Sequence, residues 1–196
     1  MTETDGYIVA PTDAANEIRM QRNGFFFADR TVKTTIGLSK IAVDLDRFIR
    51  LPIIETTDFK DDVLRIAVAS FAYDRRFHVL PDCSTDVSSV VLKKWVEELD
   101  TFFVALFKEQ PVGFLALKET APDTVFVHLA AVEEKYRMTG AAMALYANAC
   151  KAAKERGYKK LEGRVSTQNT AVMNIYTAFG ATFSDPRDIF IKKEDA

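Results

Sequence analysis

The sequence predicts an α/β domain in which a mostly buried sheet is layered against helices. Two observations predict it. Runs rich in aromatic and branched residues are typical of strands, and runs with apolar residues at helical spacing that end in glycine are typical of helices. From residue 101 onward these runs follow the order strand, strand, strand, helix, strand, helix, strand. Elements mixed in this way pack as a sheet covered by helices.

The elements of this core can be assigned in order along the chain. Residues 101–107 and 112–117 flank a Lys-Glu-Gln-Pro turn in the pattern of a hairpin, and residues 124–132 supply a third strand. The remaining elements are an Ala-rich helix over 140–156, a strand over 160–165, a helix over 169–179 and a last strand over 188–193.

Two further helices are expected before the first of these strands. Residues 58–73 start with Asp58 as a plausible cap, residues 84–99 start with Ser or Thr, and both carry apolar residues at helical period. The loop between them, residues 74–82, concentrates charge, a histidine and an aromatic residue, which is typical of a ligand-facing connection. A solvated turn between helices is the alternative.

Residues 1–51 contain a weak echo of the C-terminal part. Residues 16–29 and 174–185 each carry a helix-like segment that ends in glycine and is followed by Phe and Asp at matching offsets. The echo could be chance, because helix, glycine and strand often follow one another. Taken at face value, it predicts that the N-terminal segment is a partial copy of the last helix and hairpin of the larger domain.

Length and composition are those of a folded globular protein. The chain has 196 residues, 48% of them hydrophobic and 28% charged, with only 8 Gly and 6 Pro. At about 150 residues per domain, this length predicts one full domain and a fragment. Lys and Arg total 26 against 28 for Asp and Glu. That balance lacks the basic excess used in phosphate-backbone binding, so we expect no nucleic-acid partner.

The N-terminal residues and the cysteines narrow the class further. The chain starts with an acidic segment where a signal peptide would be basic, and no apolar run approaches the roughly 18 residues of a membrane span. We therefore expect a cytoplasmic protein with no membrane partner. Cys83 and Cys150 belong to no zinc-type spacing, so neither a metal nor a disulfide framework is expected.

The most informative stretch joins the third strand to the Ala-rich helix. The strand ends at Val132, and a short loop leads through Arg137-x-x-Gly140-x-Ala142 into the helix. Small residues let a backbone close around an anion, which the free N–H groups and positive dipole end of a first helical turn face. The loop is a candidate phosphate or oxyanion site, with a purely structural turn as the alternative.

A second motif lies further along the chain, with Asn169 and then Tyr176-x-x-Phe179-Gly180. Together the two motifs resemble the acetyl-CoA signature of the GNAT N-acetyltransferases. The resemblance implies a GNAT fold, in which a mixed central sheet is flanked by helices. It places the GNAT domain at residues 52–196 and makes residues 1–51 a partial GNAT-like segment.

The sequence departs from the family signature at two positions. Met138 stands where the signature commonly has glycine, and Glu134 stands where it often has proline. Neither change removes a backbone N–H donor, so the expected binding of the cofactor stands.

The resemblance also implies transfer of acetyl from acetyl-CoA, the co-substrate, to a primary amine. The family's contacts to coenzyme A carry over to the third strand, the anion loop and one side chain. These residues are Ala130 and Val132 for the pantetheine arm, Arg137, Met138, Thr139, Gly140, Ala141 and Ala142 for the diphosphate, and Asn169 for the amide arm.

Two residues are candidates for proton transfer. Tyr176, on the same helix face as Asn169, matches the tyrosine that GNAT enzymes commonly use to protonate the departing thiolate. A core aromatic beside Phe179 is the alternative. The amine must lose a proton, and His128 lies on the face of Ala130 and Val132 by two-residue alternation, where some GNAT members place a catalytic histidine.

The identity of the base stays open at this point. His128 can equally be a hydrogen-bonded core histidine. Other candidate bases are Glu133, Glu134 and Glu162. The oxyanion would be stabilised by a backbone N–H near Val132.

The upstream loop bears on the acceptor. Residues 73–82, followed by Trp95, are similar to the region before the core in dTDP-fucosamine acetyltransferases and related amino-sugar acetyltransferases. Arg75, Arg76 and His78 would then contact a nucleotide-sugar diphosphate, because guanidinium groups make paired hydrogen bonds to phosphate. The alternatives are another amine (amino acid, polyamine, antibiotic or protein), a non-catalytic acyl-CoA-binding module, and a purely structural protein.

A homodimer is a further expectation, since many family members pair through their C-terminal strands. Residues 188–193 could supply such an edge. The lysines at its end, Lys192 and Lys193, could equally protect a solvent-facing edge from pairing.

Overall fold

The computed structural model describes residues 2–4, 7–71, 74–78 and 85–192, without the side chains of residues 2–4, 77–78 and 85–88. Its strands are β1 (Thr2–Thr4), β2 (Tyr7–Pro11), β3 (Phe25–Gly37), β4 (Ile53–Thr56), β5 (Phe102–Phe107), β6 (Gln110–Ala121), β7 (Thr124–Val132), β8 (Lys160–Ser166) and β9 (Thr182–Lys192). Its helices are α1 (Ala14–Arg22), α2 (Lys60–Ser70), α3 (Arg75–His78), α4 (Thr85–Glu97), α5 (Ala141–Glu155) and α6 (Thr170–Ala178), with short 3-10 helices η1 (Leu38–Lys40), η2 (Asp46–Phe48) and η3 (Glu134–Thr139).

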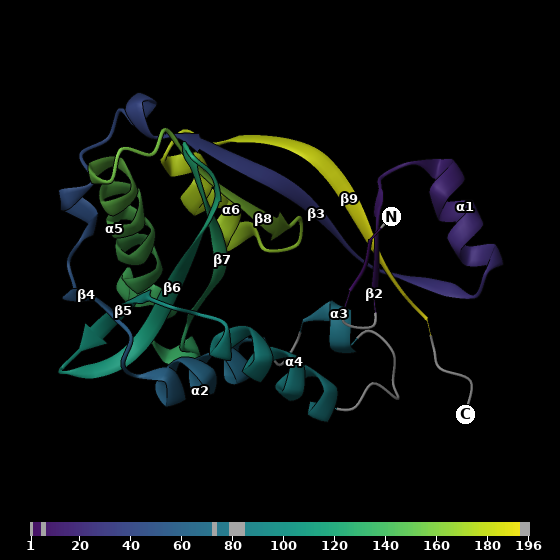
Figure 1. The fold of residues 1–196 in the computed structure, drawn as a ribbon, viewed down its shortest axis with the longest axis horizontal. Helices are drawn as coiled ribbons and strands as arrows, with labels where there is room; N and C mark the ends of the chain where they lie inside the picture. Colours follow the sequence, from purple (N-terminus) through teal and green to yellow (C-terminus); the bar gives the residue numbers. More distant parts are fainter. Residues whose placement is uncertain (1, 5–6, 72–73, 79–84, 193–196) are drawn as a thin grey trace.

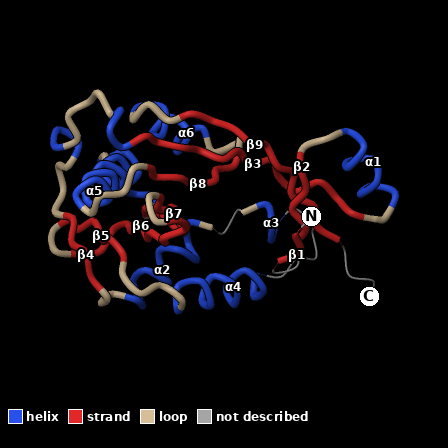
Figure 2. The backbone as a smooth tube through the Cα atoms, turned by 45° about the horizontal axis from the view of Figure 1, so that its top comes forward, coloured by secondary structure: helices blue, strands red, loops and turns tan. Residues whose placement is uncertain are grey.

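The strands described form one sheet, in the order β1-β2-β9-β3-β8-β7-β6-β5-β4. Helices α5 and α6 lie on one face of it, and α2 and α4 lie on the other (Figure 1, Figure 2). The prediction of a mixed sheet flanked by helices is confirmed. Among the described residues, no helix is long and apolar enough to cross a membrane.

Each face of the sheet has its own hydrophobic core. Leu145 of α5 and Ile175 of α6 pack with sheet residues such as Leu161. On the other face, Ile66 of α2 and Leu92 of α4 pack with sheet residues that include Phe102 and Phe114. Fully burying one such side chain contributes about 1.5–3 kcal/mol, so these cores hold both helical layers on the sheet.

The elements predicted from residue 101 to residue 179 are present, with ends shifted by a few residues at most. The last strand is longer than predicted, since β9 already begins at Thr182. The Asp58 cap is wrong. Helix α2 begins after Phe59, which has a left-handed backbone (φ 64°), and no side chain caps it.

The N-terminal segment enters the middle of the sheet. Strand β3 pairs antiparallel with β8 from Thr31 with Ser166 to Gly37 with Lys160, and it pairs with β9 on its other side. A strand from residues 1–51 therefore completes the sheet of the predicted larger domain. The domain boundary at residue 51 stays a prediction, but hydrogen bonding joins both segments into one sheet.

The C-terminal strand is not a free edge. Residues Asp188 to Ile191 pair with β2 on one side and with β3 on the other. The expectation that this stretch offers an edge for pairing is wrong, because the N-terminal strands already use both of its sides. Dimerisation itself stays a prediction.

Strands β7 and β8 are parallel and pair over only three residues. The pairs are Thr124 with Lys160, Val125 with Leu161 and Phe126 with Glu162. Beyond Phe126 and Glu162 the two strands do not pair with each other. Parallel strands that part in this way leave backbone hydrogen-bonding groups unpaired along their facing edges. Helices α5 and α6 follow these same two strands.

Candidate active site

The anion loop predicted after β7 has the backbone expected of it. Gly140 takes a left-handed conformation (φ 83°), with no atom within 4 Å of where a Cβ would stand, and α5 begins at Ala141. Glycine is therefore required here by the turn and not by crowding. The first N–H groups of a helix have no partner within it, and they face solvent-exposed Thr139 and Gly140. This arrangement fits a phosphate group.

The other residues of the loop are also near the surface. Arg137 is exposed, Met138 is 97% exposed, Ala141 is buried and Ala142 is half-buried. The Thr139 hydroxyl donates to the carbonyl of Tyr136 at 2.6 Å, which fixes the last turn of η3. The loop is thus held by its own contacts while its outer surface stays open.

The predicted contacts at the ends of β7 and β8 are partly engaged already. The Val132 carbonyl accepts hydrogen bonds from Ser70 Oγ at 3.4 Å and Arg137 Nε at 3.5 Å, while Ala130 is half-buried. Asn169 caps α6, and its Oδ1 accepts from the Val172 amide at 3.2 Å. A ligand would therefore use polar groups of these two residues other than the Val132 carbonyl and Asn169 Oδ1.

Tyr176 lies where β7 and β8 part. It is 2% exposed, and a Cβ built on Gly163 would stand 2.1 Å from its hydroxyl oxygen. Gly163 directly follows Glu162, the last residue of β8 that pairs with β7. Only glycine lets the phenol approach the strand this closely. That glycine inside a predicted strand is a sequence signal for the contact, and sequence reasoning missed it.

The surroundings of Tyr176 keep the phenol neutral. Burial raises its pKa, while the neighbouring hydroxyls of Thr34 and Tyr146 act to lower it. The rings of Tyr146 and Tyr176 meet edge-on, with centroids 5.2 Å apart. Thr34 Oγ1 is buried and makes no well-formed hydrogen bond with any described residue, although it lies close to the phenol beside Gly163. A neutral phenol with a donor beside it can release a proton.

His128 occupies a bulge in β7. Ala116 of β6 pairs with Leu129 and Leu117 pairs with Val127, so His128 is the extra residue. A bulge interrupts the two-residue alternation, so alternation alone does not place His128 with the other residues of its predicted face. Burial lowers the pKa of this half-buried imidazole, Lys118 lowers it further and Glu98 opposes them. The ring is therefore neutral at neutral pH and able to accept a proton.

Two of the three candidate glutamates are held in ion pairs. Glu133 pairs with Arg65 and, at 3.3 Å, with Lys135. Burial acts to raise the pKa of Glu133, but these two cations lower it overall. Glu162 pairs with Lys33 at 2.8 Å, and Glu134 is exposed at the start of η3. Its lowered pKa makes Glu133 a weak base, and Lys33 occupies the carboxylate of Glu162, so we favour His128 among these candidates.

The two arginines of the upstream loop have different partners. Loop residues 75–78 form the short helix α3, where Arg76 grips Asp74 through Nε (2.9 Å) and Nη2 (2.5 Å) and lies over the rings of Tyr7 and Trp95. Arg75 is exposed, and its Nε donates to the carbonyl of Ala28 at 2.5 Å. The side chain of the third predicted residue, His78, lies outside the described part of the chain.

A carboxylate that sequence reasoning missed lies beside α3. Asp29 of β3 is 8% exposed, and its Oδ1 accepts from Ser166 Oγ at 2.9 Å and from the Arg30 amide at 2.8 Å. Burial raises its pKa, the two hydrogen bonds lower it, Asp74 raises it and Arg75 lowers it. A lone Asp in a Phe-rich strand was the available signal. Its role depends on Ser166, which lies 137 residues further along the chain, so the local sequence does not reveal it.

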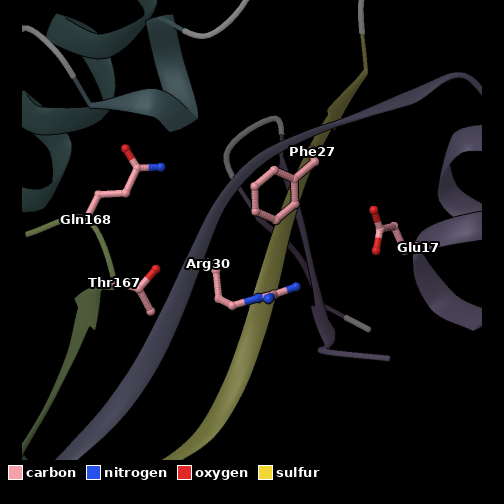
Figure 3. A pocket seen from close by; sticks show the side chains of 5 residues that line it. All are labelled: Glu17, Phe27, Arg30, Thr167 and Gln168. Carbon is pink, nitrogen blue, oxygen red and sulfur yellow. The ribbon is translucent and has the colours of Figure 1, made fainter. Parts of the chain in front are cut away.

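A shallow hollow lies beside β3 (Figure 3). It measures about 480 Å³ and is lined by Glu17, Phe27, Arg30, Thr167 and Gln168. Arg30 is already paired with Asp188 at 2.6 Å. No predicted catalytic residue lines this hollow. Over the described residues, no group of His, Cys, Asp and Glu is arranged to hold a metal ion.

Known proteins resemble this chain in sequence and in fold. Residues 64–181 match the model of the acetyltransferase (GNAT) family. A stretch of 72 residues is 39% identical to L-2,4-diaminobutyric acid acetyltransferase of Streptomyces coelicolor, which is 35% of this chain and 42% of the relative, so the match spans less than half of that protein.

Solved structures share the fold over nearly the whole chain. A protein of unknown function from Staphylococcus epidermidis has a TM-score of 0.66 at 14% identity, covering 95% of this chain and 72% of its own. A GCN5-related N-acetyltransferase from Sphaerobacter thermophilus has a TM-score of 0.65 at 16% identity, covering 95% and 58%. With the family match over more than half of its length, the chain belongs to the GNAT family of acetyltransferases.

Proposed function

We propose that this protein transfers the acetyl group of acetyl-CoA to a primary amine of a small molecule. The observation that carries the proposal is the parting of β7 and β8, with the open N-terminus of α5 after one strand and the Tyr176 phenol beside Gly163, the first residue of the other strand beyond their last pair. The binding loop thus follows one of the parting strands, and the helix that carries the proton donor follows the other.

The residues present fit coenzyme A. The α5 N-terminus with Gly140 suits the diphosphate, and the parted edge of β7 at Ala130 and Val132 suits an extended amide-bearing arm. Bound acetyl-CoA would supply the acetyl thioester. The remaining proposed contacts are Arg137, Met138, Thr139, Ala141, Ala142 and Asn169.

In the proposed reaction the amine forms a bond to the acetyl carbon and the carbon–sulfur bond breaks. Tyr176 donates its phenolic proton to the departing sulfur, and Thr34 and Tyr146 ease that release because they lower the pKa of the phenol. His128, which is neutral, accepts the proton that the amine loses, directly or through water. The protein therefore makes two proton transfers, one to the departing sulfur and one from the attacking amine.

Among acceptors, we propose an amino acid that carries a second amine. The partial identity to a diaminobutyric acid acetyltransferase supports this class. The expected amino-sugar nucleotide remains the second candidate, with exposed Arg75 as its support. It is less favoured because the guanidinium of Arg76 is occupied by Asp74.

The experiment is release of free coenzyme A from acetyl-CoA with a panel of amines. We expect fastest release with L-2,4-diaminobutyrate, slower release with spermidine and least with a nucleotide-linked amino-sugar. Fastest release with the amino-sugar would reverse the choice of acceptor. Tight binding of coenzyme A without release on any amine would instead support a non-catalytic module, and no binding in calorimetry would reject the function.

A further inference from the structure

We propose that Asp29 and Arg75 bind the charged end of the acceptor, with Asp29 holding an ammonium group and Arg75 a neighbouring carboxylate. This inference rests on the proposed function and names the residues that select its acceptor. The acceptor would be an amino acid whose α-ammonium and α-carboxylate are held at this pair while a second amine is acetylated.

The Asp29 carboxylate has one oxygen available. Both of its hydrogen bonds, from Ser166 and from the Arg30 amide, go to Oδ1. Within the described part of the chain, Oδ2 receives none. The nearby guanidinium of Arg30 is directed instead to Asp188, with contacts of 2.6 and 3.1 Å. Oδ2 keeps some exposure to solvent, so a ligand ammonium can reach it and donate a charge-assisted hydrogen bond.

Arg75 supplies the opposite charge next to it. Its Nε is anchored on the carbonyl of Ala28, the neighbour of Asp29, while the residue as a whole is exposed. Arg75 forms no ion pair with a described residue. Arg76 and Asp74 fix α3 in place through their paired contact and the Tyr7 ring. The guanidinium of Arg75 is thus positioned, without an ion pair among the described residues, and can receive a ligand carboxylate.

The charges around this pair favour a zwitterion over a diphosphate. Two carboxylates, Asp29 and Asp74, lie within electrostatic range of each other, and Arg75 acts on the same site. Because Arg76 already pairs with Asp74, Asp29 and Arg75 remain as one negative and one positive group, and a diphosphate brought to this place would be repelled by Asp29 and attracted by Arg75 alone. An adjacent ammonium and carboxylate would find an opposite charge for each.

Distance separates this pair from the site of chemistry. Ser166, which holds Asp29, lies three residues beyond Gly163 on β8, or about 10 Å at 3.3 Å per residue. That is too far for Asp29 to take a proton from an amine beside Tyr176, because a base must lie within hydrogen-bond reach. Asp29 is therefore a binding residue, and the acceptor must bridge the interval with a chain of several atoms.

The two ends are on opposite faces of the sheet. The side of Gly163 where a Cβ would stand faces Tyr176 of α6. Because side chains alternate along β8, Ser166 faces the opposite side of the sheet, where α3 lies. The two faces are connected where β7 and β8 part, because no strand pairing closes the sheet there. An acceptor held at Asp29 and Arg75 would therefore reach the thioester from the side opposite α5 and α6.

The test compares three acceptors on the wild type and on the variants Asp29→Asn and Arg75→Ala. L-2,4-diaminobutyrate carries both charged groups, 1,3-diaminopropane lacks the carboxylate, and 4-aminobutyrate lacks the α-ammonium. We expect the wild type to prefer L-2,4-diaminobutyrate. Asp29→Asn should raise the KM for it about 10- to 100-fold, the range for one charge-assisted contact, with kcat and the KM for acetyl-CoA nearly unchanged.

The second variant should act on the other charge. Arg75→Ala should abolish the preference for L-2,4-diaminobutyrate over 1,3-diaminopropane and leave the preference over 4-aminobutyrate. The matched control is Asp188→Asn on the adjacent strand, which removes a buried carboxylate of structural type and should lower Tm while leaving the ranking of the three acceptors unchanged.

The outcomes separate the two proposals. Equal kcat/KM for the three acceptors in the wild type, or unchanged KM in Asp29→Asn, would overturn the role of this pair while acetyl transfer stood. A loss of preference in Asp188→Asn as large as in Asp29→Asn would also overturn it, because the effect would then be structural. No release of coenzyme A with any amine would overturn the proposed function itself.

Discussion

The two sides of the proposed active site are built in opposite ways. The coenzyme side, from β7 through α6, comes from one continuous stretch of chain, residues 124–178, and its parts follow one another directly. The acceptor side brings together Asp29 of β3, Arg75 of α3 and Ser166 of β8, which lie far apart in the sequence. A local sequence motif can therefore predict the coenzyme side, whereas the acceptor side forms only when distant strands pair.

The largest expected effect is a loss of kcat when the proton donor on the coenzyme side, Tyr176, is replaced. Tyr176→Phe keeps the ring packing but removes the hydroxyl, so kcat should fall about 100-fold, the lower range for a general acid, with the KM for acetyl-CoA unchanged. Steady-state kinetics measure this. Tyr146→Phe is the matched control and should lower kcat far less. An unchanged kcat in Tyr176→Phe would remove its assigned role.

The next effect acts where the two sides meet. Gly163→Ala would put a Cβ 2.1 Å from the Tyr176 oxygen and 3.0 Å from its ring carbon, so the phenol must move. We expect a loss of about 2–3 kcal/mol in unfolding free energy, as for an overpacked core, together with lower kcat. Gly37→Ala is the control, since its nearest contact is the flexible side chain of Lys40 at 3.4 Å. Equal denaturation midpoints for Gly163→Ala and the wild type would contradict the close approach.

A smaller effect is expected at the Arg30–Asp188 ion pair, which joins β3 to β9 next to Asp29. Arg30→Ala leaves Asp188 buried with the Thr12 hydroxyl as its remaining side-chain donor among described residues. We expect a loss of about 1–2 kcal/mol in unfolding free energy, less than for a fully buried pair because Arg30 is 43% exposed. Urea denaturation measures it. The double variant Arg30→Ala with Asp188→Asn should recover part of the loss, and no recovery would exclude the unpaired charge as its cause.

The smallest effect concerns the pH dependence of stability. Burial raises the pKa of Asp29 above its ordinary value of 3.8, so the folded chain holds this proton more tightly than the unfolded chain does. The contribution of Asp29 to stability is therefore complete below the ordinary pKa and is lost as the pH rises through the folded pKa. The hydrogen bonds from Ser166 and Arg30, and the charges of Asp74 and Arg75, are included in this net direction.

Asp29→Asn should remove that loss. Its unfolding free energy relative to the wild type should increase as the pH rises from below 3.8 through the folded-state pKa, and then level off. Urea denaturation at a series of pH values measures the difference. A constant difference across this range would mean that the Asp29 pKa is not raised. A more stable variant that binds the acceptor less well would show that this carboxylate is kept for binding and not for stability.

Sequence patterns predicted much of the coenzyme side because its signals are short in range. Gly140 needs a left-handed backbone, α5 ends before Gly157, and Tyr176 follows Asn169 by two helical turns. Each of these depends on backbone conformation within a few residues. The bulge at His128 could not be predicted from such local signals, because a bulge exists only relative to the paired strand, here β6.

The sequence by itself determined the α/β order, the two helical layers and the loop for an anion, because periodicity and glycine placement act locally. Only the tertiary structure decided that β3 lies between β8 and β9, that residues 188–191 are not an edge, and that Asp29 meets Ser166 and Arg75. The physical reason is that strand pairing joins segments through backbone hydrogen bonds, which every residue except proline can form in the same way. The sequence of a strand therefore does not show which distant strand will pair with it.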